Sequence, residues 1–145
     1  MESISAELGY RAEQLLYRYA VAVDAGDLGA LRALITDDVT IEQNGKADIG
    51  SEEFIGVYRA FGESPAEFSR HLISNVRVAA ASKGKVSVEA YFEATVCAPG
   101  SNQRLYGKYA DVFVEREGEL LIERKGISVE RILDLQVNEV EYQPY

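Results

Sequence analysis

The spacing of apolar residues changes midway along the chain, and this change limits the folds that the chain can adopt. Up to residue 61, apolar side chains recur every three or four positions, as they do on one face of a helix. From residue 71 to residue 129 they alternate with polar side chains in stretches rich in β-branched and aromatic residues, which is typical of strands. Helices that come first and strands that follow indicate an α+β fold.

The first half of the chain predicts three helices. The first covers Glu7–Asp24, after which Gly26 offers a C-terminal cap and Asp27 can cap a short second helix. The third helix begins at Ser51 and runs through Phe61. The apolar side chains of the second helix are expected to be Leu28, Leu31, Leu34 and Ile35.

The second half predicts four long strands joined by short reversals, which together form an antiparallel meander. A shorter strand, Val39–Glu42, precedes the third helix and ends at an Asn44-Gly45 turn. We expect residues 1–145 to form one domain, with residues 134–145 as a C-terminal tail that packs on a neighbouring subunit or frays. The long strands are predicted over His71–Ala81, Val86–Cys97, Leu105–Glu115 and Glu119–Val129.

Charge and cysteine content narrow the expected partners and location. The formal net charge is −9, which disfavours binding to nucleic acid or to an anionic membrane surface. No stretch approaches the roughly 18–20 apolar residues of a membrane span, and the N-terminus does not resemble a signal peptide. The single cysteine, Cys97, cannot form an internal disulfide, so we expect a reducing, cytoplasmic location. A small molecule or another protein is the expected partner.

Common cofactor motifs are missing from the sequence. One cysteine and one histidine cannot build a structural zinc site. No glycine-rich phosphate loop follows a strand and opens a helix, and no G-x-S-x-G nucleophile elbow occurs. We therefore expect neither a metal nor an organic cofactor.

Three groups of residues, in this order along the chain, carry a resemblance to a known family. The first is a tyrosine-rich helix, LLYRYAVAVDAGDLGAL, followed by the strand entry Thr36–Val39; the second is the strand RHLISNVRV; the third is Gly107–Asp111, then Glu117-Gly118 and Ile122–Arg124. Together they resemble the SnoaL-like branch of the nuclear transport factor 2-like superfamily, from about Ala6 to Ile132. The resemblance implies a cone of N-terminal helices packed on a curved, mainly antiparallel sheet that encloses an apolar pocket.

The resemblance also implies a catalytic pair. The scytalone dehydratase and bile acid 7α-dehydratase branch has an Asp at the end of the first helix and a His near the start of the first long strand. Asp24 and His71 match this pattern, and Tyr19 matches a Tyr five residues before the Asp in the bile acid enzyme. The superfamily's dehydrochlorinase has a Lys in place of that Tyr. Scytalone dehydratase uses a second His, which this sequence lacks.

These residue types suit proton transfer at carbon. A neutral imidazole at His71 can take a proton next to a carbonyl and return it to a leaving group. A carboxylate at Asp24 would fix its tautomer, and Tyr19 would polarise the substrate oxygen. The alternatives are a His71 that hydrogen-bonds locally, a Tyr19 that belongs to the core, and an Asp24 that merely ends a helix. However, a negative charge is unfavourable at the C-terminal end of a helix, so Asp24 is expected to have a partner.

Other side chains are candidates for substrate contact. Tyr17 competes with Tyr19, and alternation places Asn75 on the same face as His71, where it could instead satisfy a backbone group. Tyr109 and Asp111 share a face of the third long strand. Arg124 would either pair with Asp111 or stabilise an oxyanion.

The predicted function is therefore a cofactor-independent lyase or isomerase acting on a medium-sized apolar carbonyl compound, such as a steroid, terpenoid, polyketide or aromatic. The alternatives are a non-catalytic binding or accessory subunit, and a polyketide cyclase or ketosteroid-isomerase-type enzyme with Asp111 as base. A homodimer is also expected, because alternation places Leu72, Val76 and Val78 on the sheet face that the helices do not cover.

Overall fold

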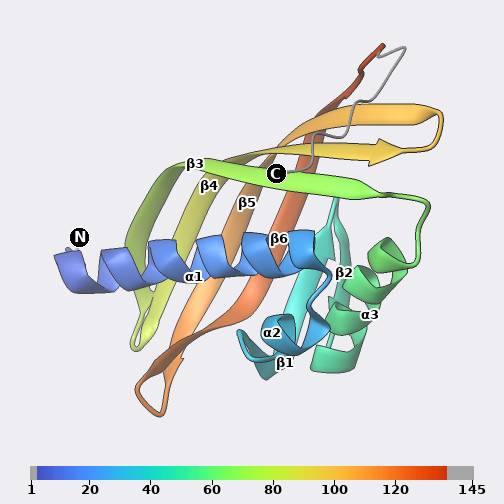
Figure 1. Ribbon diagram of the computed structural model, residues 1–145. Coiled ribbons are helices and arrows are strands. Elements are labelled where there is room, and N and C mark those ends of the chain that lie inside the picture. Colours follow the sequence, from blue (N-terminus) through green and yellow to red (C-terminus); the bar gives the residue numbers. More distant parts are fainter. Residues whose placement is uncertain (1–2, 137–145) are drawn as a thin grey trace, which may run out of the picture.

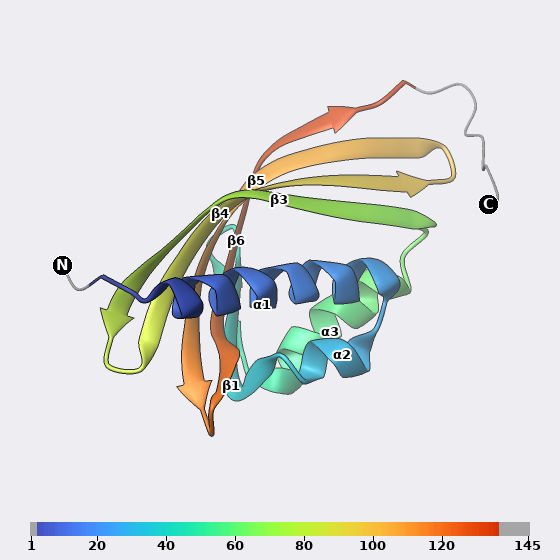
Figure 2. The same ribbon diagram turned by 60° about the vertical axis from the view of Figure 1, so that its left-hand side comes forward.

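Three helices lie on one side of a single curved sheet in the computed structural model, which describes residues 3–136 (Figure 1). The sheet bends over the helices but does not close on itself, so the helices fill its open side (Figure 2). This confirms the expected α+β class. The helices are α1 (Ala6–Ala25), α2 (Leu28–Arg32) and α3 (Ser51–Gly62); the strands are β1 (Ile35–Gln43), β2 (Lys46–Ile49), β3 (Phe68–Ser82), β4 (Lys85–Ala98), β5 (Ser101–Arg116) and β6 (Glu119–Asp134).

The sheet contains the predicted meander and two further strands. Its order is β2-β1-β6-β5-β4-β3, and β3 to β6 pair antiparallel as expected, with each strand longer than predicted. The predicted strand Val39–Glu42 is the centre of the longer β1, which pairs parallel to β6. A second short strand, β2, follows the Asn44-Gly45 turn and makes the sheet six-stranded and mixed.

The predicted second helix is too long at its C-terminal end. α2 stops at Arg32, and Ile35 begins β1 opposite Ile122 of β6. The backbone amide of Ile122 donates to the carbonyl oxygen of Leu34 over 2.8 Å. Leu34 and Ile35 are both buried, so their apolar side chains contribute to the core from the sheet edge rather than from a helix face.

A β-bulge in β3 reverses the side-chain alternation that the sequence suggests. Asn75 has a positive φ of 53°, and the pairing with β4 shifts between Ser74 and Arg77. Beyond the bulge, Val76 and Val78 pack against the core, whereas Leu72 is 57% exposed. The predicted outer patch of these three residues is therefore wrong. The homodimer stays a prediction without that support.

α1 brings one end of the helical layer to the beginning of β3. Its start is capped by the Ser5 hydroxyl, which accepts from the backbone amide of Leu8, and its end by Gly26 in the left-handed conformation. The face between these caps packs into the core through Leu15, Leu16 and other apolar side chains. None of the helices within residues 3–136 has the length and apolarity needed to cross a membrane. Residues 137–145, most of the predicted tail, lie outside the described residues.

Candidate functional site

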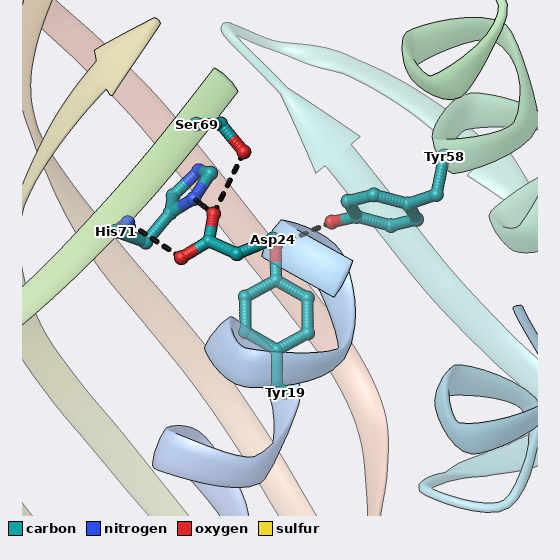
Figure 3. A network of polar contacts seen from close by, with 5 residues as sticks. All are labelled: Tyr19, Asp24, Tyr58, Ser69 and His71. Atoms are coloured by element: carbon teal, nitrogen blue, oxygen red, sulfur yellow. Dashed lines mark hydrogen bonds and ion pairs between the residues drawn. The ribbon is translucent and has the colours of Figure 1, made fainter. Parts of the chain in front are cut away.

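The end of α1 meets the start of β3 through Asp24 and His71. The Nδ1 atom of His71 lies 2.6 Å from Oδ1 of Asp24, and the His71 backbone amide donates to Oδ2 over 2.8 Å (Figure 3). The hydroxyl of Ser69 donates to Oδ1 over 2.8 Å. The side chains of His71 and Asp24 are 15% and 9% exposed, so this network is largely shielded from solvent. The structure thus brings together the two residues that the sequence pairs.

Strand geometry explains how this network forms. Residues two apart on a strand point to the same face, so Ser69 and His71 approach Asp24 together. Burial alone would raise the pKa of Asp24, but the hydrogen bonds from His71 and Ser69 and the charge of His71 outweigh it and hold the pKa below its ordinary value. Asp24 is therefore an ionised acceptor at physiological pH, and its partners compensate for its place at the negative end of α1.

The carboxylate fixes the orientation of the imidazole ring. Because Asp24 can only accept, the ring nitrogen that faces it, Nδ1, carries the proton in the neutral form of His71. This leaves the lone pair on Nε2. Within residues 3–136, no side chain or backbone group hydrogen-bonds to Nε2, and His71 lines an apolar cavity. A base with a fixed tautomer therefore faces a space that can hold a ligand.

The cavity has a volume of about 190 Å³ and lies between α1, α3 and the inner face of the sheet. Its polar side chains other than tyrosine are His71 and Gln43, the last residue of β1. Such an apolar lining with few polar groups matches the expected pocket. The lining comprises Tyr19, Val23, Gln43, Val57, Tyr58, Phe61, His71, Phe92, Ala94, Val96, Leu105, Tyr109, Ile127 and Val129.

Three tyrosines meet in the cavity wall. The hydroxyls of Tyr19 and Tyr58 lie 2.5 Å apart, and the Tyr19 ring makes edge contacts with the rings of Tyr58 and Tyr109. Burial raises the pKa of all three hydroxyls, so they remain protonated. One hydroxyl of the Tyr19–Tyr58 pair donates to the other, so one proton of that pair stays available for a carbonyl oxygen of a ligand. Tyr19 and Tyr109 are among the predicted site residues, whereas Tyr58, which lies on α3, is not.

Tyr58 and Ser69 were not predicted as site residues, although the periodicity of the sequence places each of them on the face of its element that points to the site. Tyr58 lies on the apolar face of α3, three positions after Ile55 and four after Phe54. Ser69 lies two positions before His71, so strand periodicity alone would place it beside the imidazole. Each was hidden because a tyrosine on an apolar helix face and a serine near a strand end both have ordinary structural roles.

A second carboxylate–nitrogen pair lies in the core between β5 and β6. Lys125 Nζ is 2.8 Å from Asp111 Oδ2, and both side chains are 0% exposed. The ammonium group also lies 3.3 Å from the centroid of the Tyr109 ring and 4.1 Å from that of Tyr19. Asp111 shares the inner face with Tyr109 as predicted, but it does not line the cavity.

The predicted pairing of Arg124 with Asp111 is wrong. Val112 pairs with Arg124 but Phe113 pairs with Ile122, so β6 has an extra residue at this point and its alternation reverses. Lys125 consequently points inward, and Arg124 instead hydrogen-bonds to Glu42 of β1.

Two other candidate residues lie away from the cavity. The hydroxyl of Tyr17 donates to the Glu13 carboxylate one turn earlier on α1, and Asn75 is exposed at the bulge of β3. Neither lines the cavity, so the structure separates both from His71. In the part of the chain that the structure describes, no group of three or more His, Cys, Asp and Glu side chains is arranged to hold a metal ion.

Comparison with known proteins identifies the family of this chain. Residues 9–125 match the SnoaL-like domain. No curated protein matches the chain in sequence. A putative scytalone dehydratase from Novosphingobium aromaticivorans superposes with a TM-score of 0.79 at 19% identity, over 89% of this chain and 88% of that one. A hexachlorocyclohexane dehydrochlorinase from Novosphingobium barchaimii superposes with a TM-score of 0.78 at 16% identity, over 97% of this chain and 100% of that one. At such identities the two structures show a shared fold.

Proposed function

This chain belongs to the SnoaL-like domain family, and on that premise we propose that it is a lyase or isomerase that removes a proton next to a carbonyl in an apolar small molecule. The observation that carries the proposal is the Asp24–His71 contact at the wall of an apolar cavity. Two proteins of the same fold are named for eliminations, a putative dehydratase for the loss of water and a dehydrochlorinase for the loss of hydrogen chloride, and an elimination is also the reaction proposed here.

In the proposed reaction, Nε2 of His71 takes the proton from the carbon next to the carbonyl. The electron pair of that bond moves toward the carbonyl oxygen, which receives a hydrogen bond from a tyrosine hydroxyl of the wall. Asp24 stabilises the imidazolium that results. The imidazolium then protonates a β-hydroxyl, which leaves as water while the carbon–carbon double bond forms. Return of the proton to another carbon would give an isomerase instead.

Two alternatives fit the geometry less well. A binding or accessory subunit would use the cavity but would not need three hydrogen bonds to hold Asp24 against His71. A ketosteroid-isomerase-type enzyme with Asp111 as base would need that carboxylate in the cavity. Asp111 is instead enclosed in the core and bonded to Lys125 and to the backbone amide of Gly126.

The test is exchange of carbon-bound hydrogen in D₂O, followed by NMR across a panel of neutral cyclic ketones and β-hydroxyketones. Wild type should accelerate exchange or elimination for some of these compounds. His71→Ala should lower that rate by roughly 10²–10⁴-fold, the usual contribution of general acid–base catalysis. Leu72→Ala is the matched control, because Leu72 is the next residue of β3 and points to the opposite face. Exchange by His71→Ala at the wild-type rate would refute the mechanism.

A further inference from the structure

A second cavity lies on the far side of the wall that bounds the first. Its volume is about 180 Å³, and it lies between the end of α1, α2, the end of α3 and the start of β3. Val23, Tyr58 and Phe61 line both cavities. These three side chains therefore form a partition with one cavity on each side. Further residues of the second cavity include Asp24, Leu28, Leu31, Ala66, Glu67 and Ser69.

The three residues of this partition differ in how deeply they are buried and how tightly they are packed. Val23 and Tyr58 are 5% and 9% exposed and belong to the buried core, where Tyr58 is also tied to Tyr19 by a hydrogen bond. Phe61 is only half-buried, lies in the last turn of α3, and stands outside that core. A half-buried ring at a helix end can change rotamer at low cost, whereas a close-packed core side chain cannot. Phe61 is thus the member of the partition that can swing aside.

The volumes of the two cavities indicate that a single ligand would occupy both. Cavities that bind small ligands usually measure about 300–1,000 Å³. The first cavity, at about 190 Å³, and the second, at about 180 Å³, each fall below that range, but their combined volume lies within it. The dyad spans the partition as well, because His71 lines the first cavity and Asp24 and Ser69 line the second.

We propose that the two cavities form one bipartite site for an elongated, neutral, apolar ligand that passes Phe61. The reacting end would lie against His71 in the first cavity, and the far end would occupy the second; this assignment of ends rests on the function proposed above. Asp24 and Glu67 are among the residues that line the second cavity, and their negative charges would repel an anionic group there. The far end of the ligand is therefore not anionic, and the apolar side chains of Leu28, Leu31 and Phe61 favour a hydrocarbon group there.

Binding of two neutral ketones tests this proposal without any turnover. Acetophenone is short enough for the first cavity, and 4-acetylbiphenyl carries a second ring in line with the first. Both would be titrated by ligand-observed NMR against wild type and against Ala66→Phe, which fills the second cavity. We expect Ala66→Phe to lower the affinity for 4-acetylbiphenyl by about 10-fold or more, because the new side chain excludes the second ring of this ligand from the second cavity. The affinity for acetophenone should change by less than about twofold.

Two further variants guard against a misfolded Ala66→Phe protein. Leu28→Ala removes apolar contact from the second cavity alone and should selectively weaken 4-acetylbiphenyl, whereas Val57→Ala affects the first cavity and should weaken both ketones. Leu72→Ala, on the opposite face of β3, should bind both ketones as wild type does. The titration involves no proton transfer, so its outcome separates a failure of this proposal from a failure of the catalytic one. The bipartite site would be refuted if wild type did not bind 4-acetylbiphenyl, or if Ala66→Phe and Leu28→Ala bound it as well as wild type.

Discussion

Two carboxylate–nitrogen pairs of similar length occupy different parts of this molecule. Asp24 and His71 are joined over 2.6 Å at the cavity wall, and Asp111 and Lys125 over 2.8 Å in the closed core. The first pair retains 9% and 15% exposure, while the second has none. Length alone therefore does not separate a reactive pair from a structural one. Access to a cavity does, because a general base must lie within hydrogen-bond reach of a bound ligand, directly or through one water.

The surroundings of the two pairs reinforce this contrast. Asp24 receives three hydrogen bonds that keep it ionised, and the pKa of its carboxyl is lowered. Burial raises the pKa of Asp111 and lowers that of Lys125, although each charge stabilises the other. The ammonium group of Lys125 also contacts the ring faces of Tyr19 and Tyr109. We infer that the enclosed pair positions the tyrosine wall and the open pair carries the chemistry.

The largest effect is expected from breaking the enclosed pair. Lys125→Met leaves the Asp111 carboxylate buried without its partner, which should lower the free energy of unfolding by about 3–5 kcal/mol. Urea titration followed by circular dichroism measures this. The double variant Lys125→Met/Asp111→Leu removes both charges and should recover most of the loss. A single variant within about 1 kcal/mol of wild type would show that the pair is not a structural element.

Breaking the Asp24–His71 pair should mainly lower turnover. Asp24→Asn keeps the shape of the side chain but can donate to Nδ1, which favours the wrong tautomer of His71. We expect turnover of a responsive ketone to fall by roughly 10²-fold or more, with affinity for the ligand nearly unchanged because apolar burial supplies most of it. Rates from exchange in D₂O and affinities from NMR titration check both parts. A loss of affinity as large as the loss of rate would indicate a binding role instead.

Acid should reveal the stabilisation that Asp24 provides. Its folded pKa lies below the value of about 4 in an unfolded chain, so this stabilisation is complete above about pH 4 and is lost as the pH falls through the folded pKa. Urea unfolding between pH 2.5 and 6 should therefore show a shallower acid loss for Asp24→Asn than for wild type. Leu72→Ala keeps the network and should retain the wild-type slope. Equal slopes for wild type and Asp24→Asn would mean that Asp24 gains nothing from its partners on folding.

The smallest effect concerns the second donor to Asp24. Ser69→Ala removes one hydrogen bond but leaves both contacts with His71, so we expect a loss of about 1 kcal/mol in stability and about 10-fold or less in turnover. Thermal unfolding and the exchange assay measure these two quantities. A loss of activity equal to that of His71→Ala would show that Ser69, rather than the imidazole, is indispensable.

The sequence predicts the elements of this fold better than the faces of its strands. Periodicity and capping residues suffice for α1, and the resemblance suffices to pair Asp24 with His71. Alternation fails after Asn75 and before Lys125, because each lies next to a bulge, and one extra residue turns the side chains that follow it to the other face. Asn75, Val76 and Arg124 were misplaced for this reason. A bulge has almost no local sequence signal, since it is set by pairing with a neighbouring strand.

The tautomer of His71 tests the catalytic proposal most directly, and it needs no substrate. His71 is the only histidine of the chain, so ¹⁵N–¹H correlation spectra of the imidazole contain the signals of one residue. In the neutral ring we expect the proton on Nδ1 and a lone pair on Nε2, and we expect Asp24→Asn to disturb that state while Leu72→Ala preserves it. A wild-type spectrum with the proton on Nε2, or one unaffected by Asp24→Asn, would contradict the assignment of Asp24 and His71 as a catalytic dyad.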